Sequence, residues 1–187
     1  MSTKALVHPR QMSPERDSLP GIVAPPGTTI YTVYATVDNE TWPNAVLNAG
    51  SDRNTVIDDD VLKAERLFPQ AVEFGVRRKF IIINSTITMY GGWNEACWWA
   101  MENGLVTTHP REVFAVSKDN PSLDQKIGIK TIYLHSTTEF QLNGIKKYCC
   151  SVKWGCHRRT CFAGPIHGSN YTEDFYLFHY AKEARRP

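Results

Sequence analysis

Apolar and polar residues follow two different spacings along this chain, which together predict strands and helices. β-branched and aromatic residues dominate residues 29–37, which indicates a strand. Residues 80–89 are the clearest strand, because a continuous apolar run is followed by alternating apolar and polar positions. The same criteria predict further strands at residues 113–116, 130–135, 145–154, 160–162 and 175–180.

Two other segments show the spacing of a helix. Aspartates at residues 58–60 provide a negatively charged start, and apolar residues at helical spacing continue from there to residue 72. Pro69 should kink this helix or split it in two. The second helix is expected over residues 93–103 and should end at Gly104.

Turn-forming residues separate these elements and help to define the fold class. Residues 42–52 and 118–128 are expected to be loops, and glycines supply the turns between the last strands. The chain is therefore expected to have two short helices in its first two-thirds, packed on a mixed or antiparallel sheet, and a β-rich C-terminal part. This order of elements predicts an α+β fold.

The first 27 residues differ in composition from the rest of the chain. Five prolines interrupt any helix or central strand there, and polar residues fill the gaps between them. We expect residues 1–27 to form an extended proline-rich arm and residues 28–187 to form a single globular α+β domain. Such an arm would dock on neighbours, which indicates other protein subunits as partners, in a homo-oligomer or a larger assembly.

The overall composition is that of an ordinary globular protein. With 187 residues, 42% of them hydrophobic, the chain is long enough to bury roughly two-thirds of its unfolded surface. No apolar run approaches the roughly 20 residues of a membrane helix, so no membrane partner is expected. The N-terminus lacks the apolar core of a secretory signal, which predicts a cytoplasmic protein with free cysteines, in a host cytoplasm or a particle if viral.

Cys97 is the first candidate catalytic residue. It lies near the start of the predicted helix 93–103, where the partial positive charge of the helix end lowers a thiol pKa and favours the thiolate. The base that reaches it would be His167 or, as the other option, His135. A Cys followed by Trp98 at a helix start, with a later histidine on a sheet, resembles the papain-like cysteine proteases, viral leader proteases among them. The resemblance implies a cysteine hydrolase; the alternative is a buried core thiol.

Residues 149–167 contain several potential zinc ligands. Their spacing includes no Cys-x2-Cys pair, and adjacent cysteines on a strand point to opposite faces. We therefore expect neither a metal nor another cofactor, and we interpret these cysteines as small hydrophobic residues. The potential ligands are Cys149, Cys150, Cys156, His157, Cys161 and His167.

The net charge of +2 is too small to indicate a polyanion partner, but the charge is unevenly distributed. Residues 140–172 contain five basic and no acidic side chains. Cations neutralise phosphates and aromatic rings stack on bases, so segment 144–167 is a candidate nucleic-acid-binding module. An edge strand protected by lysines has the same pattern. The candidate nucleic-acid-binding residues are Lys146, Lys147, Lys153, Trp154, Arg158 and Arg159.

Alternation along the strand predicted at residues 145–154 groups its side chains into two faces. One face is expected to be exposed and basic, and its members are Lys147, Cys149, Ser151 and Lys153. Three tryptophans next to turns are candidate anchors of a protein interface, unless they cover the core: Trp42, Trp93 and Trp154.

Three functions are compatible with these features. The first is a non-enzymatic structural or interaction component of a multi-subunit assembly, such as a virus or phage particle, with the arm docking on neighbours. The second is a papain-like cysteine hydrolase using Cys97 and His167. The third is a nucleic-acid-binding module. The arm and the lack of a strong catalytic motif favour the first, and whether the protein is an enzyme stays open at this point.

Overall fold

A computed structural model describes residues 21–25, 28–50, 56–68, 72–84, 92–142, 146–155, 158–166 and 173–180. Within these residues, five α-helices and one 3-10 helix surround a mixed sheet of nine strands, so the predicted α+β class is confirmed. The elements are β1 (Ile30–Thr36), α1 (Trp42–Ala49), β2 (Val56–Ile57), α2 (Asp59–Lys63), η1 (Ala64–Leu67), β3 (Arg77–Asn84), α3 (Gly92–Glu102), β4 (Leu105–Thr107), α4 (Pro110–Asp119), α5 (Leu123–Ile127), β5 (Thr131–His135), β6 (Phe140–Leu142), β7 (Lys146–Gly155), β8 (Arg158–Pro165) and β9 (Asp174–Tyr180).

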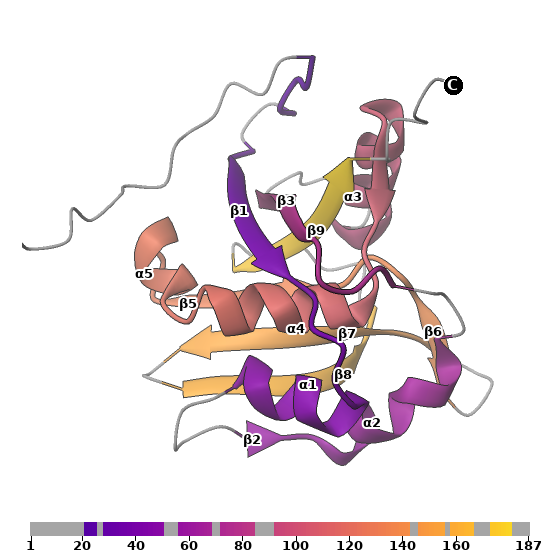
Figure 1. The fold of residues 1–187 in the computed structure, drawn as a ribbon. Helices are drawn as coiled ribbons and strands as arrows, with labels where there is room; N and C mark the ends of the chain where they lie inside the picture. Colours follow the sequence, from indigo (N-terminus) through magenta and orange to yellow (C-terminus); the bar gives the residue numbers. More distant parts are fainter. Residues whose placement is uncertain are drawn as a thin grey trace, which may run out of the picture.

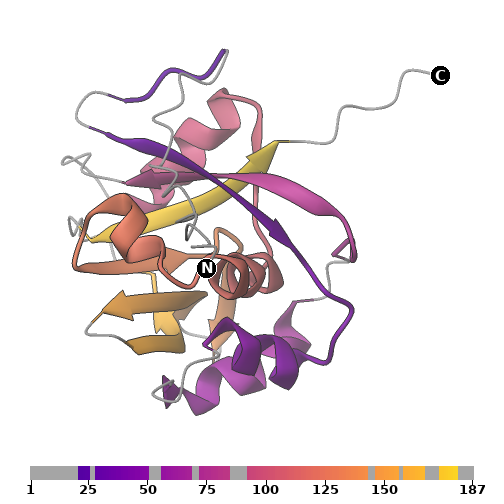
Figure 2. The same ribbon diagram turned by 60° about the vertical axis from the view of Figure 1, so that its left-hand side comes forward.

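The strands pair in the order β1-β3-β9-β5-β7-β8-β2, with β4 also paired to β9 and β6 to β7. The pairs β5–β9 and β2–β8 are parallel, and the other pairs are antiparallel. The last strand, β9, therefore lies between β3 from the first half of the chain and β5 from the second half (Figure 2). It joins the two halves of the sheet.

Alternating side chains of the sheet contribute to two separate cores, one on each face. On one face, α1 and α4 pack over the sheet, and Ile82, Leu134 and Val152 belong to this larger core (Figure 1). On the other face, residues of α3 pack against Ile81 of β3 and Tyr176 of β9 in a smaller core. The helix α3 covers only the β3–β9 part of this second face. The part formed by β5, β7 and β8 is not covered by α3 and lines a pocket.

Residues 42–52 were expected to be a loop, and this prediction is wrong for most of them. The helix α1 begins at Trp42, directly after the N-cap residue Thr41, and Pro43 lies in its first turn. A proline is tolerated there because the first backbone N–H groups of a helix have no partner within it. Trp42 also donates a hydrogen bond from Nε1 to the carbonyl of Val61, at 2.8 Å. The buried residues of α1 recur at helical spacing: Trp42, Ala45, Val46 and Ala49.

The strand expected at residues 113–116 is also wrong, because these residues form the middle of α4. His109 caps this helix: its Nδ1 accepts a hydrogen bond from the backbone N–H of Arg111, and its own backbone N–H donates to the Glu112 carboxylate. A short apolar run does not distinguish a strand from a buried helix. The helix α5 similarly occupies part of residues 118–128, which were expected to be a loop.

The other predicted elements that the structure describes are confirmed, with shifted ends. The helix expected over residues 58–72 is shorter, because α2 ends at Lys63 and continues only as the 3-10 helix η1. Its predicted cap is present, since the Asp58 side chain accepts a hydrogen bond from the backbone of Asp60 at 2.7 Å. Residues 85–89 of the predicted strand 80–89 lie outside the described residues.

The described part of the expected arm, residues 21–25, lies against the chain's own α3. The indole Nε1 of Trp99 donates a hydrogen bond to the carbonyl of Val23 at 2.9 Å, and Ile22 packs against the smaller core. Among the described residues, no helix combines the length and the apolar character needed to cross a bilayer.

Candidate active site

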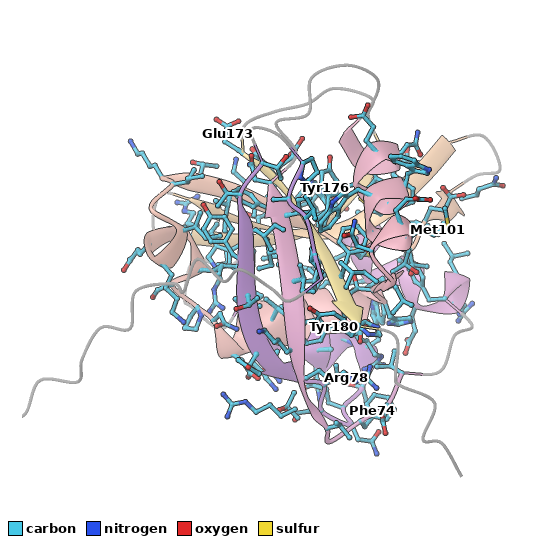
Figure 3. All side chains as sticks on the ribbon, turned by 90° about the horizontal axis from the view of Figure 1, so that it is seen from above. Phe74, Arg78, Met101, Glu173, Tyr176 and Tyr180 are labelled. Atoms are coloured by element: carbon cyan, nitrogen blue, oxygen red, sulfur yellow. The ribbon has the colours of Figure 1, made fainter. Side chains whose placement is uncertain are left out.

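A pocket of about 630 Å³ lies on the part of the sheet that α3 leaves uncovered. Trp93, at the start of α3, contributes to its wall and donates a hydrogen bond from Nε1 to the carbonyl of Ser136 at 3.3 Å. Tyr176 and Met101 lie on opposite sides of α3 (Figure 3), and the pocket is on the Tyr176 side. Its lining includes the following ionisable and nucleophilic residues: Tyr133, His135, Cys149, Ser151, Lys153, Glu173, Asp174 and Tyr176.

Four of these residues form a connected group, here called the His135 cluster. His135 Nδ1 lies 2.7 Å from Ser151 Oγ, and His135 Nε2 lies 3.1 Å from Asp174 Oδ1. Cys149 Sγ lies 3.8 Å from His135 Nδ1 and 3.6 Å from Ser151 Oγ. A histidine is thus held by a carboxylate on one side and faces a hydroxyl and a thiol on the other, which is the arrangement of a catalytic nucleophile, base and orienting acid.

The strand register explains why these residues meet. His135 on β5 is the direct cross-strand partner of Ser151 on β7 and of Tyr176 on β9. Cys149 lies two residues before Ser151 and therefore shares its face. For Cys149, Ser151 and Lys153 the shared face agrees with the grouping predicted from the sequence, but it belongs to the lining of a pocket. The side chain of the fourth member, Lys147, lies outside the described part of the chain.

Asp174 approaches His135 from the neighbouring strand. It is paired with Tyr133, two residues before His135, so its carboxylate reaches the imidazole diagonally across β5 and β9. The Tyr133 ring is stacked on His135, with centroids 6.5 Å apart and planes at 7°. The imidazole ring is therefore held by contacts from three strands.

The electrostatic environment keeps His135 protonated. Burial alone would lower the pKa of His135, but its hydrogen bonds to Asp174 and Cys149, together with their negative charge, raise that pKa to about 9. In the imidazolium form both ring nitrogens donate, Nδ1–H to Ser151 and Nε2–H to Asp174. The Ser151 hydroxyl can then donate its own hydrogen to Cys149 Sγ, which stabilises negative charge on the sulfur.

Both potential nucleophiles are buried, with Cys149 at 3% and Ser151 at 0% exposed. Ser151 is fully buried, and its cross-strand partner on β8 is Phe162, whose ring lines the pocket. The partner of Cys149 is Gly164, which has no side chain. A Cβ atom at Gly164 would lie only 3.0 Å from Phe162 Cε2, so no larger residue fits without moving that ring. The Phe162 ring therefore also occupies the space next to Gly164, and both Cys149 and Ser151 line the pocket.

Cys97 lies on α3, apart from the hydrogen bonds of the His135 cluster. Burial, followed by the charges of Cys149 and Glu139, raises the pKa of Cys97 to about 12. The direction is opposite to the lowering expected for a thiol near a helix start, and the thiol is neutral at physiological pH. His167, its expected partner, lies outside the described residues.

The basic segment does not present a continuous basic surface within the described residues. Trp154 is 1% exposed, and Arg159 is 4% exposed with its guanidinium bound to the carbonyl of Ser117 at 2.8 Å. Lys153 lines the pocket, and Arg158 is exposed at the start of β8. The side chains of the two other candidates, Lys146 and Lys147, lie outside the described part of the chain.

The expected interface tryptophans differ in exposure. Trp42 is 1% exposed and belongs to the larger core, as does Trp154, so neither can act as an exposed anchor. Trp93 is partly buried and lines the pocket.

The potential zinc ligands separate in the fold. Cys150 and Cys161 belong to the larger core, with Cys161 Sγ 3.6 Å from the carbonyl of Val46, whereas Cys149 faces the pocket. Cys156, His157 and His167 lie outside the described residues. Among the residues that are described, no three His, Cys, Asp or Glu side chains are grouped in a way that would hold a metal ion.

Comparisons with known proteins identify no relative: no protein family, curated protein or solved structure matches the chain. The geometry of the pocket is therefore the basis for assigning a function.

The sequence indicates little of the His135 cluster as a catalytic site. It indicates His135 only as a second possible partner for Cys97, and it does not indicate Asp174. The chemistry of Asp174 becomes apparent only through the parallel pairing of β5 and β9.

Proposed function

We propose that the protein is a cysteine-dependent hydrolase that acts on small acyl compounds, with Cys149 as nucleophile. His135 is the acid and base, Asp174 orients the imidazole, and Ser151 bridges the ring and the thiol. The observation that supports this most directly is the position of His135 between Asp174 and the Cys149–Ser151 pair, on the floor of a 630 Å³ pocket.

The reaction that this arrangement supports has two steps. The Cys149 thiolate attacks the carbonyl carbon of the substrate, and the carbonyl electrons move onto oxygen. When the tetrahedral intermediate collapses, the bond to the leaving group breaks and His135 Nδ1–H supplies the proton it needs. Water then attacks the thioester, giving a proton to His135 as the carbon–sulfur bond breaks, which restores the starting pair.

The charge of His135 favours cysteine over serine as the nucleophile. An imidazolium cannot accept a proton from Ser151, but it is the partner of a thiolate. Access does not separate the two residues, because both line the pocket and both are buried. The nucleophile is therefore assigned from the charge of the imidazole and not from access.

The first experiment is alkylation by iodoacetamide at pH 7, with peptide mapping by mass spectrometry. We expect Cys149 to react before Cys97 and Cys150, because burial raises the pKa of both other thiols. The second measurement is hydrolysis of an activated aryl ester by wild type, Cys149→Ala and the matched control Cys97→Ala. The proposal requires activity to be lost in Cys149→Ala and kept in Cys97→Ala.

Two results would contradict the proposal. One is labelling of Cys97 ahead of Cys149; the other is a Cys149→Ala variant that hydrolyses the ester as fast as wild type. Loss of activity in Cys97→Ala alone would instead support the hydrolase that uses Cys97 and His167.

A cytoplasmic location would fit the proposal, because a reducing compartment keeps Cys149 as a free thiol.

We also propose, as a second candidate function, that the chain is a subunit of a larger protein assembly. Trp98 and Met101, one turn apart on α3, are 62% and 65% exposed, and Val23 of the arm is 77% exposed. Exposed apolar side chains of this size favour a protein partner. Native mass spectrometry of the full chain tests this: an oligomer supports assembly, and a monomer at micromolar concentration counts against it.

A further inference from the structure

The far end of the pocket from Cys149 contains a cation. Lys153 lies four residues along β7 from Cys149, on the same face, which separates their Cα atoms by about 13 Å. Its Nζ lies 4.9 Å from the centroid of the Tyr133 ring. Within the described residues, no carboxylate lies at ion-pair distance from this ammonium group.

The stretch between Cys149 and Lys153 has aromatic walls. Tyr133 and Phe162 meet edge to face, with centroids 6.2 Å apart and planes at 87°. Trp93 and Tyr176 line the same pocket from α3 and β9. Rings of this kind pack favourably against another aromatic ring and offer few hydrogen-bonding groups to a polar chain.

The acidic groups of the pocket do not neutralise Lys153. Asp174 is already engaged by His135, through a contact of 3.1 Å. Glu173, the residue before Asp174, also lines the pocket. A ligand with an anion at this end would pair with Lys153, whereas a ligand with an amine would have to rely on Glu173.

On this basis we propose that the substrate is an elongated acyl compound with an aromatic ring and an anionic group at the end remote from the reacting carbonyl. The ring would pack against the aromatic wall that Tyr133 and Phe162 form together, the anion would pair with Lys153, and the carbonyl would reach Cys149. The assignment of the carbonyl end rests on the proposed function, but the recognition of an aromatic anion does not.

The test is a binding measurement in which no reaction is needed. Biphenyl-4-carboxylate, its neutral carboxamide and 4-phenylbenzylamine are titrated by calorimetry into wild type, Lys153→Met, Lys153→Arg and the control Lys63→Met. Lys63→Met removes the same charge from the exposed side chain of Lys63 on α2. Thermal melting of each variant shows that it is folded.

We expect wild type and Lys63→Met to bind the carboxylate about tenfold more tightly than the carboxamide, which is the usual size of one charge-assisted hydrogen bond. Lys153→Met should lose this preference and Lys153→Arg should keep it. The preference should also decrease with added salt.

Several outcomes would overturn the inference: equal affinity for carboxylate and carboxamide in wild type, tighter binding of the amine, an unchanged preference in a folded Lys153→Met, or no binding of any probe. The result is separable from the catalytic proposal. A carboxylate preference in a protein whose Cys149 is inert would support the ligand class and reject the hydrolase, and the converse result would do the opposite.

Discussion

The charged pair of His135 and Asp174 makes the stability of the protein depend on pH in a defined window. The pKa of His135 is 6.5 in an unfolded chain and about 9 in the fold. A base whose pKa is raised by folding stabilises the folded state fully below the unfolded pKa, and this contribution is lost as the pH rises through the folded pKa. The free energy of unfolding should therefore fall between pH 6.5 and pH 9.

The magnitude follows from the same two values. Each pKa unit corresponds to about 1.4 kcal/mol, so the rise from 6.5 to about 9 is worth about 3 kcal/mol. Asp174→Asn keeps a polar side chain of the same shape but removes the charge that holds the imidazolium. It should lower the pKa of His135 and reduce this pH dependence, leaving the part that comes from Cys149.

The assay is urea unfolding of wild type and Asp174→Asn at pH 6, 7.5 and 9, with an NMR titration of the His135 ring proton beside it. His135→Gln, which cannot titrate, is the control and should show no loss in this window. The window also lies below the range in which Cys97, with its pKa of about 12, would contribute. A His135 titration near 6.5 in wild type, or equal pH dependence in Asp174→Asn, would refute the reasoning.

Two further predictions concern the packing around His109 and Gly164. Burial and the charge of Arg111 lower the pKa of His109 to about 4, so the protein should lose about 3 kcal/mol of stability as the pH falls from 6.5 to 4. His109→Asn, which can still cap α4, should show a smaller loss in acid unfolding; an equal loss would contradict this. Gly164→Ala should slow alkylation of Cys149 and, because its Cβ would crowd Phe162, lower the unfolding free energy by about 1–3 kcal/mol. Faster labelling with unchanged stability would show that Gly164 does not limit access.

A helix or strand could be predicted from the sequence where polar residues mark one of its faces. The strands β5, β7 and β9 were found because their β-branched and aromatic residues are bounded by turn signals. The helix α4 was mistaken for a strand because residues 112–117 are all buried, which removes the polar side from which a helical period is recognised. The helix α1 is not predicted from the sequence, because a proline such as Pro43 is common in loops as well as in the first turn of a helix.

The candidate site was less accessible to sequence reasoning for a different reason. Alternation correctly placed Cys149 and Ser151 on one face of a strand. It could not say which other strands flank them, and Asp174 reaches His135 only because β9 inserts beside β5. Cys97 is a candidate nucleophile in the sequence because it lies near the start of a predicted helix. In the fold, burial raises its pKa more than the helix dipole lowers it. Cross-strand register is set by the whole sheet, so no local pattern reveals it.

The central position of β9 has a consequence for the order in which the protein can be made. Synthesis proceeds from the N-terminus, so β3 and β5 exist before residues 174–180 have been added. Until then, the backbone groups of β3 and β5 that pair with β9 have no partner, and exposed edges of this kind favour aggregation. A nascent or truncated chain that ends before Asp174 lacks both the strand that joins the two halves of the sheet and the carboxylate that orients His135. Pairing of β9 with β3 and β5 therefore joins the two halves of the sheet and completes the candidate site at the same time. A premature stop codon upstream of β9 would abolish both.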